Sequence, residues 1–265
     1  MNSAGTVTTA PLELRVLGSS SSIPRPGRAC SGYLVRGAGR SVVLDLGSGA
    51  FANLRSALPA EDVDAVVISH MHPDHFLDLV PMRYALRYGP RAHARKPLLY
   101  LPPDGAALLR RVVDAFPAEV SRDYLEVYDI RTYDPDEELR VGDLRVRFAL
   151  TAHFIATFAM RCEFESVSVT YSADTAPEPR VCGLAHETDA FVCEATLAAQ
   201  SSENGQRGHS SAREAGGMAQ SAGVRRLVLS HYGAESTPAE LTAEGSKTFQ
   251  GAIVVADDNM DLALT

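Results

Sequence analysis

His70-Met71-His72-Pro73-Asp74-His75 directly follows the apolar stretch Val63–Ser69 in this chain. The run places three imidazoles and one carboxylate within six residues, where a short buried strand ends and a tight loop begins. Imidazole and carboxylate together suit Zn²⁺, and also Mn²⁺ or Fe²⁺. Because the whole chain has eight histidines, a cluster this dense favours a metal site over an ordinary surface loop.

Length and composition indicate one globular domain. The 265 residues are enough for one large domain or two small ones, and no linker rich in Pro, Gly and Ser divides them. With 45% hydrophobic and 22% charged residues, the composition is that of an ordinary soluble protein. The absence of an apolar run of eighteen residues excludes a membrane span. We therefore expect a flexible leader over residues 1–11 and one domain over residues 12–265.

The cellular compartment follows from the N-terminus and the cysteines. The first residues lack the basic region and apolar core of a secretory signal. The cysteines show no paired spacing, so we expect reduced, buried thiols in a cytoplasmic protein at Cys30, Cys162, Cys182 and Cys193. The net charge of −8 argues against a general affinity for nucleic-acid backbones, which requires a basic surface.

The apolar pattern predicts strands in both halves of the chain, each group followed by helices. The expected strands are residues 12–17, 32–35, 41–45, 63–69, 98–101, 160–164, 167–171, 190–193, 227–230 and 252–256, with two more around Gly142-Asp143 within 139–150. The expected helices are residues 51–58, 77–88, 105–116, 211–222 and 238–249. This order predicts an αββα sandwich, in which two mixed β-sheets are flanked by helices.

Three further candidate ligands follow later strands: His153, Asp174 and His231. Side chains at strand ends meet at a shared sheet edge, where open sheets build their sites. One assignment gives two metals three ligands each, with Asp174 bridging them: His70, His72 and His153 for the first, and Asp74, His75 and His231 for the second. Such an open, dinuclear site is catalytic. Two ions about 3.5 Å apart lower the pKa of a bridging water, and the hydroxide attacks a phosphoryl group.

The motif and the order of the later ligands resemble the metallo-β-lactamase superfamily. The match spans nearly the whole chain, from Leu17 to Asp258. The resemblance implies the αββα fold and two divalent ions, most simply Zn²⁺ with Mn²⁺ or Fe²⁺ as alternatives. It also implies that Asp45 supports the ligand loop through hydrogen bonds to the ligands.

Two further segments resemble the ribonuclease Z and phosphodiesterase branch of that superfamily. Cys193-Glu194-Ala195-Thr196-Leu197 resembles its HEAT motif, with cysteine in place of histidine, and Gly208-His209-Ser210-Ser211 resembles its HST motif. The resemblance implies that Glu194 orients His209, which protonates the departing alkoxide, and that Asp74 belongs with them as a catalytic residue. The alternative is that Ser210 or Ser211 caps the following helix and His209 has no role.

One departure from ribonuclease Z bears on the substrate. That enzyme carries a long arm that grips tRNA, inserted between the ligands that match His153 and Asp174. Here these positions are 174 − 153 = 21 residues apart, which is room for one hairpin. The pattern is closer to armless phosphodiesterases, including enzymes similar to class II cyclic nucleotide phosphodiesterases. A β-lactamase is disfavoured, because that branch uses neither Asp174 as a bridge nor the Glu194–His209 pair.

A basic segment with tyrosines lies shortly after the ligand loop. Arg83 and Arg87 share a helix face, as do Tyr84 and Tyr88. This face suits a phosphate held by arginine and a base stacked on tyrosine, so these four residues are candidate substrate contacts. The alternative is a solvated helix face with the tyrosines packed inward.

The sequence thus predicts a dinuclear metal-dependent hydrolase that acts on a small phosphodiester such as a cyclic nucleotide. A ribonuclease Z-type endoribonuclease that processes tRNA 3′ ends is the second hypothesis, with RNA as its substrate. A catalytically inert metal- or nucleotide-binding module is the third, and a lactonase or thioesterase is a further option. Family resemblance also implies a homodimer.

Overall fold

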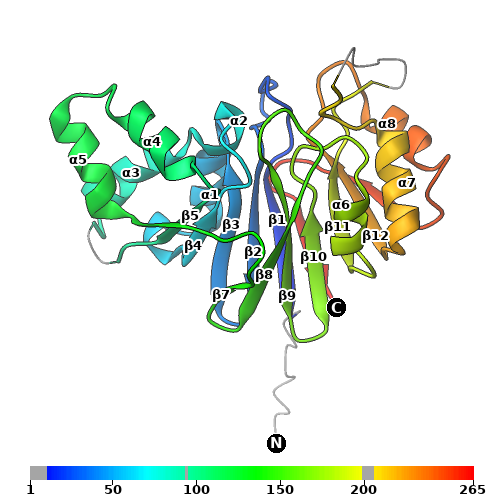
Figure 1. Cartoon of the computed structure of the whole chain (residues 1–265), viewed down its shortest axis with the longest axis horizontal. Coiled ribbons are helices and arrows are strands. Elements are labelled where there is room, and N and C mark those ends of the chain that lie inside the picture. The colour runs from blue at the N-terminus through cyan, green and yellow to red at the C-terminus, as the bar shows by residue number, and fades with distance from the viewer. Residues whose placement is uncertain (1–10, 93–94, 199–205) are drawn as a thin grey trace, which may run out of the picture.

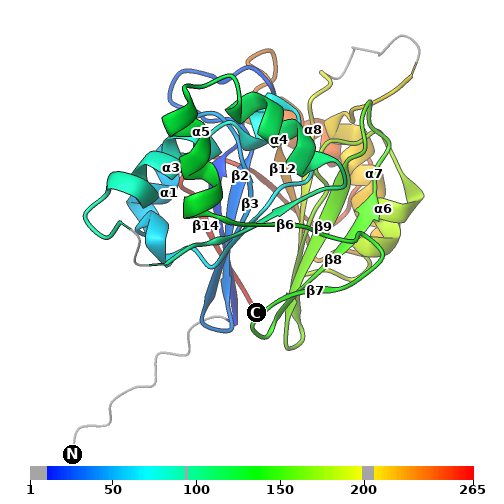
Figure 2. The ribbon, with the colours of Figure 1, turned by 60° about the vertical axis from the view of Figure 1, so that its left-hand side comes forward.

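The fold is the expected four-layer αββα sandwich (Figure 1). The computed structural model describes residues 11–92, 95–198 and 206–265, so all but the last residue of the expected leader, and His93, lie outside the described residues. Figure 2 shows the two sheets between two helical layers. Among the described residues, no helix is both long and apolar enough to cross a bilayer.

The first sheet has seven strands in the spatial order β14-β1-β2-β3-β4-β5-β6. Strands β14, β1, β2 and β3 pair antiparallel, whereas β3, β4, β5 and β6 pair parallel. Their bounds are β1 Leu12–Gly18, β2 Gly32–Gly37, β3 Arg40–Leu46, β4 Ala65–Val67, β5 Leu98–Leu101, β6 Asp129–Thr132 and β14 Asp261–Leu264.

The second sheet repeats this plan in the order β13-β12-β11-β10-β9-β8-β7. Strands β7 to β10 form an antiparallel meander, and β10 to β13 pair parallel. Their bounds are β7 Leu139–Val141, β8 Leu144–Leu150, β9 Phe158–Phe164, β10 Val167–Tyr171, β11 Ala190–Glu194, β12 Arg226–Ser230 and β13 Ala252–Val255.

The helices form the two outer layers. On the first sheet lie α1 Ala50–Ala57, the 3₁₀ helix η1 Ala60–Asp62, α2 Pro73–Phe76, α3 Leu79–Tyr88, α4 Gly105–Val113 and α5 Ala118–Val127. On the second sheet lie α6 Pro179–Leu184, α7 Ala212–Ala222 and α8 Pro238–Gly245.

Capping boxes begin helices α7 and α8. Ser211 and Glu214 form the first box, and Thr237 and Glu240 form the second. These side chains accept hydrogen bonds from backbone N–H groups that have no partner in the first helical turn.

Three apolar clusters hold the layers together. One lies between the sheets and contains Val16, Tyr33, Val146 and Tyr171. The other two lie between each sheet and its helices. Both faces of the central parallel strand β4 are covered, and Ala65–Val67 is accordingly apolar throughout.

The structure contains elements that the sequence pattern did not reveal: η1, α2, α5, α6, β6 and β14. Strands β6 and β14 are four-residue strands at the edges of the first sheet, and their sequences, Asp129–Thr132 and Asp261–Leu264, mix charged and apolar residues. An edge strand with one solvated side has no long apolar run, and α6 is only six residues long. The predicted helix 77–88 begins at Leu79.

The cysteines are all free, as expected. Cys30, Cys162 and Cys193 are buried, whereas Cys182 is only half-buried, which corrects the expectation of four buried thiols. Burial raises the pKa of the Cys162 thiol to about 12.

The topology aligns the carboxyl ends of the central strands at one edge of the sandwich, at the top in Figure 1. Strands β3 and β4 of the first sheet and β10, β11 and β12 of the second are parallel within their sheets, and β8 points the same way as β10 because each is antiparallel to β9. Each strand carries a polar side chain there, at its carboxyl end or shortly after it, so two sheets supply one site.

Candidate metal centre

The structure gathers a first group of four side chains: His70, His72, His153 and Asp174. His70 Nε2 lies 3.0 Å from His72 Nδ1, which lies 3.1 Å from His153 Nε2. The loop after β4 supplies two of these side chains, and the second sheet supplies the other two.

A second group contains Asp74, His75, Asp174 and His231, all of them buried. His75 Nε2 and His231 Nε2 each lie 3.3 Å from Asp74 Oδ2. Asp74 and His75 belong to the one-turn helix α2, which Pro73 begins at a position where its missing N–H has no helical partner to lose.

Asp174 joins the two groups. Its Oδ2 atom lies 3.8 Å from the Nε2 atoms of His70 and His153. Its Oδ1 atom lies 3.3 Å from His75 Nε2 and 3.5 Å from His231 Nε2. One carboxylate thus faces both groups with a different oxygen, as required of a bridging ligand.

Hydrogen bonds behind the histidines fix which ring nitrogen faces each group. Ser69 Oγ donates its only hydrogen to Asp45 Oδ2, so it accepts from His70 Nδ1 at 2.9 Å. His75 Nδ1 donates to Asp45 Oδ2 at 2.7 Å. In the neutral rings, the lone pairs of both Nε2 atoms therefore point at the cluster.

The same arrangement holds on the second sheet. His153 Nδ1 donates to the Gly208 carbonyl at 2.8 Å. Thr196 Oγ1 donates to the His231 carbonyl and accepts from His231 Nδ1 at 2.8 Å. Ligand histidines in metal proteins are oriented in this way by a partner on their other nitrogen.

The nitrogen and oxygen atoms of the cluster are arranged to bind divalent cations rather than to form hydrogen bonds with one another. In the first group, His72 Nδ1 lies 3.0 and 3.1 Å from the Nε2 atoms of His70 and His153, and a single hydrogen on it could satisfy only one of these two lone pairs. In the second group, His75 Nε2 and Asp174 Oδ1 are buried and have no hydrogen-bond partner. Unpaired buried polar atoms are rare and costly, and a cation between them would satisfy both. The donor set of imidazole and carboxylate suits Zn²⁺, Mn²⁺ and Fe²⁺ alike.

Burial and charge set the protonation of the cluster. Burial lowers the pKa of His70, His72 and His153, so these rings favour the neutral form that binds metals. Burial also opposes a charge on His75, but the carboxylates of Asp174 and Asp45 raise its pKa well above the usual value.

The Asp74 carboxylate stays ionised. Burial alone would raise its pKa, but the hydrogen bond with His231 and the positive charge of nearby His75 lower the pKa of Asp74 far below its usual range. The cluster therefore holds an anion at the position of Asp74 throughout the physiological pH range.

Asp45 supports the ligand loop, as the resemblance implied. This buried carboxylate accepts hydrogen bonds from Ser69 N, Ser69 Oγ, His75 Nδ1 and Tyr171 Oη, at 2.7 to 2.9 Å. Its backbone has a φ of 56°, in the left-handed region that aspartate tolerates better than most residues. Ser69 and Tyr171 are contacts that the sequence alone did not single out.

Glu194 and His209 form the expected pair beside the second group. Glu194 Oε1 lies 3.0 Å from His209 Nδ1 and also accepts from Thr175 N. Glu194 Oε2 accepts from the backbone N–H groups of Ser210 and Thr196. The alternative reading was correct about the helix cap, since Ser211 caps α7, but the cap and the pair coexist.

The cysteine that replaces histidine in the HEAT-like motif points away from the cluster. Cys193 precedes Glu194 on β11, and adjacent strand residues face opposite sides of the sheet. Cys193 packs in the cluster between the second sheet and its helices, whereas Glu194 faces the sheet edge. The substitution therefore leaves the Glu194–His209 pair intact.

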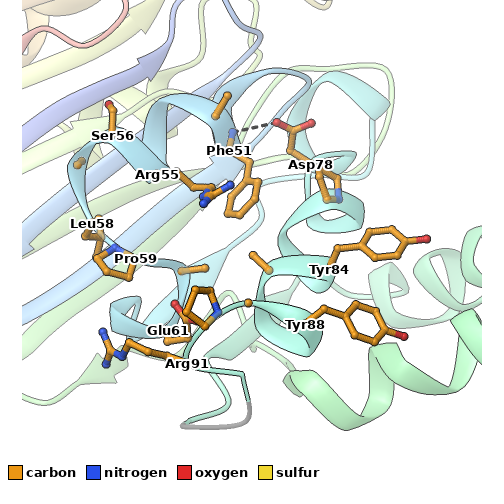
Figure 3. Close-up of a pocket in the computed structure, with 17 residues that line it drawn as sticks. Phe51, Arg55, Ser56, Leu58, Pro59, Glu61, Asp78, Tyr84, Tyr88 and Arg91 are labelled. Atoms are coloured by element: carbon orange, nitrogen blue, oxygen red, sulfur yellow. Dashed lines mark hydrogen bonds between the residues drawn. The ribbon is translucent and has the colours of Figure 1, made fainter.

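The structure does not bring the four expected substrate contacts, Arg83, Tyr84, Arg87 and Tyr88, to the cluster. In the chain, helix α3 lies in the connection between the parallel strands β4 and β5. It therefore runs back from the carboxyl ends of these strands, over about 15 Å. Tyr84 and Tyr88 line a cavity of about 920 Å³ between α1 and α3 (Figure 3). Arg83 is fully buried, with its guanidinium 3.8 Å from the centre of the Tyr84 ring.

Two carboxylates near the end of the chain have structural roles. Asp258 accepts hydrogen bonds from Ser19 and Ala29 and so anchors the loop after β1, and Asp257 pairs with Arg28. His186 lies on the surface, with 69% of its side chain exposed.

An αββα sandwich that gathers histidines and carboxylates at the carboxyl ends of both sheets defines a class of metal-dependent hydrolases. The sequence profile described as the beta-lactamase superfamily domain matches residues 40–232. The chain belongs to this family, the metallo-β-lactamase superfamily, as its ligand motif predicted.

Similar proteins agree with this assignment. An uncharacterized protein of Mycobacterium tuberculosis is 31% identical over 96% of this chain and 94% of its own length. The probable metallo-hydrolase YhfI of Bacillus subtilis is 28% identical over 92% of this chain and 97% of its own. The crystal structure of YhfI matches with a TM-score of 0.84 at 26% identity, over 95% of this chain and 99% of that one. Ribonuclease Z of Thermobifida fusca is 29% identical over 95% of this chain and 94% of its own.

Replacing Asp45 by asparagine tests its support of the ligands. Asparagine keeps the shape and tolerates the left-handed backbone, but it cannot accept all four hydrogen bonds. We expect Asp45→Asn to weaken metal affinity about 10- to 100-fold, as measured by competition with a chromophoric chelator. Asp261→Asn, which removes an exposed carboxylate paired with Arg15, is the matched control and should change affinity little. Equal affinity in both variants would contradict the role of Asp45.

The histidine pKa shifts predict a pH dependence for the metal-free protein. The lowered pKa values of His70, His72 and His153 remove stability as the pH falls below the unfolded value of about 6.5. The raised pKa of His75 adds stability that is complete below that value and is lost as the pH rises toward the folded pKa. We therefore expect the Tm of chelator-treated protein to peak near pH ~6.5.

Protein loaded with metal should behave differently, because its ligands bind in their deprotonated forms. Its Tm should keep rising between pH 6.5 and 8, where the metal-free curve falls. A metal-free Tm that also rises over this range would contradict a protonated His75 in the empty cluster.

Proposed function

We propose that this hydrolase cleaves small phosphodiesters, with a cyclic nucleotide as the specific candidate. The Glu194–His209 pair beside the two ligand groups carries the proposal. A departing alkoxide is a poor leaving group that needs a proton, whereas the thiolate released from a thioester leaves without one. The pair therefore favours a reaction that releases an alkoxide, such as phosphodiester hydrolysis, over thioester hydrolysis.

The ligand groups would hold two divalent ions, with His70, His72 and His153 in one set, Asp74, His75 and His231 in the other, and Asp174 in both. Such ions lower the pKa of a bound water and polarise the phosphoryl oxygens. Zn²⁺ is the simplest choice for these ligands.

The protein's own groups handle the protons. Glu194 accepts a hydrogen bond from His209 Nδ1, which orients the ring so that Nε2 can present a proton to the leaving oxygen. Asp74 is ionised, and its Oδ2 atom can accept a hydrogen bond from the attacking water. His209 is partly accessible, with 18% of its side chain exposed, as a proton donor to a bound substrate must be.

The short connection between His153 and Asp174 supports a small substrate. Between them lie only β9 and β10, a hairpin that completes the second sheet. No segment there extends from the sandwich to grip a folded RNA, and the net charge of −8 offers no general attraction for its backbone.

Processing of tRNA 3′ ends remains the second candidate, because Thermobifida fusca ribonuclease Z is similar over nearly the whole chain. Hydrolysis of bis-p-nitrophenyl phosphate, 3′,5′-cyclic AMP and a precursor tRNA, with metal content determined on the same sample, separates the two. Turnover of the small diesters with little tRNA cleavage supports the proposal. Preferred cleavage of the tRNA would overturn it, and inactivity of metal-loaded protein would favour a binding module.

His72→Ala should abolish hydrolysis while the fold persists. The half-buried ring contacts only other members of the cluster through its Nδ1 atom, so its loss leaves the apolar clusters intact. Removing a hydrogen-bond partner of a metal ligand typically costs up to ~100-fold in activity. We expect the loss of His72 itself to lower kcat/KM by more than this, with metal content reduced. The surface variant His186→Ala is the control. Normal turnover by His72→Ala would refute the assignment of the first group.

His209→Ala should discriminate between leaving groups. With 3′,5′-cyclic AMP, whose leaving alkoxide needs a proton, we expect kcat to fall about 10²- to 10⁴-fold. With bis-p-nitrophenyl phosphate the loss should be much smaller, because nitrophenolate leaves without protonation. An equal loss on both substrates would show that His209 acts on binding or structure instead. Glu194→Ala is a poorer test, since Glu194 also holds three backbone N–H groups.

A further inference from the structure

An exposed apolar patch borders the metal cluster. Of the six large hydrophobic side chains exposed in the described part of the chain, three lie at the end of β8 and in the segment that connects it to β9. They are Leu150, Phe154 and Ile155, with exposed fractions of 38%, 49% and 40%. The same segment carries His153 of the first ligand group. Exposed apolar side chains gathered at a polar site indicate contact with an apolar part of a ligand.

Phe154 lies beside the proton-donating pair. Its ring centre is 5.0 Å from that of His153 and 5.8 Å from that of His209, at an angle of 67° to the His209 ring. A group on the oxygen that receives the proton from His209 would therefore lie near this phenyl ring.

The backbone of Gly208 holds the phenyl ring in place. A Cβ atom at Gly208 would lie only 2.4 Å from Phe154 Cε2, so the ring packs directly on this glycine. The Gly208 carbonyl in turn accepts the hydrogen bond from His153 Nδ1. The ring thus has one side supported by backbone, and such support reduces the entropy lost on binding.

We propose that Phe154, flanked by Ile155, is the platform on which the base of a nucleoside phosphodiester stacks. The proposal rests on the phosphodiesterase function and narrows its substrate class to diesters whose leaving alcohol belongs to a nucleoside. A phenyl ring binds any base through its π-face, so the platform selects for a base without reading which one. The aromatic pair Tyr84 and Tyr88, on α3, does not contact the cluster and is the competing platform.

Two cyclic phosphates that differ only in the base provide the test. Both 3′,5′-cyclic AMP and ribose 3′,5′-cyclic phosphate present the same bonds to the cluster, but only the first has a ring to stack. In Phe154→Ala we expect KM for cyclic AMP to rise about tenfold with little change in kcat, and the ribose compound to be unaffected. Phe154→Tyr should keep the preference, and Phe154→Leu, which keeps apolar bulk without a ring, should lose most of it.

Several results would overturn the platform. Phe154→Ala could affect both cyclic phosphates equally, or it could leave the KM for cyclic AMP unchanged. The preference for the substrate with a base could also be lost in Tyr88→Ala instead. A change in the sedimentation of Phe154→Ala with unchanged base preference would likewise overturn it, and would identify the patch as a contact between copies of the chain.

Binding measurements separate this proposal from the phosphodiesterase function. Calorimetry of AMP and of ribose 5-phosphate reports the base contact without turnover. If the wild-type protein hydrolyses neither cyclic phosphate, the proposed function fails, and calorimetry still decides the platform. Tighter binding of AMP that is lost in Phe154→Ala supports the platform, and equal binding of the two phosphates by the wild-type protein overturns it.

Discussion

The site depends on one buried carboxylate, that of Asp45. It accepts hydrogen bonds from the loop after β4 through Ser69 and His75, and from the second sheet through the hydroxyl of Tyr171. A single side chain thus sets the orientation of His70 and His75 and ties the ligand loop to the opposite sheet. A buried anion with four donors is stable only if every donor stays in place, so the loop has little freedom to rearrange.

The remaining ligands are positioned by the same principle with different partners. A carbonyl orients His153 and a threonine hydroxyl orients His231, while Glu194 holds His209 together with three backbone N–H groups. The Glu194–His209 pair and the loops around it therefore share one anchor. Ala173 and His231 have left-handed backbones beside the cluster, a conformation that persists in non-glycine residues only where surrounding contacts hold it.

The sequence was sufficient for the fold class and for the grouping of the ligand candidates, because both leave local signals. Four candidate ligands within six residues, and single polar residues after apolar strands, can be recognised without a structure. Phe154, Ser69 and Thr196 gave no such signal, since their importance arises from contacts with residues distant in the chain. For the tyrosines on α3, a local signal was present but insufficient. Their spacing showed that they share a helix face, but the direction of the helix relative to the sheet decides which residues lie next to that face.

The division of the ligand groups between the sheets has a consequence for the whole fold. Each group takes two side chains from the first half of the chain and two from the second. A chain cut between β6 and β7 would give two fragments, neither of which holds a complete set for either cation. Bound ions would then act as a cross-link between the halves, so that reassembly of the fragments becomes a metal-dependent association.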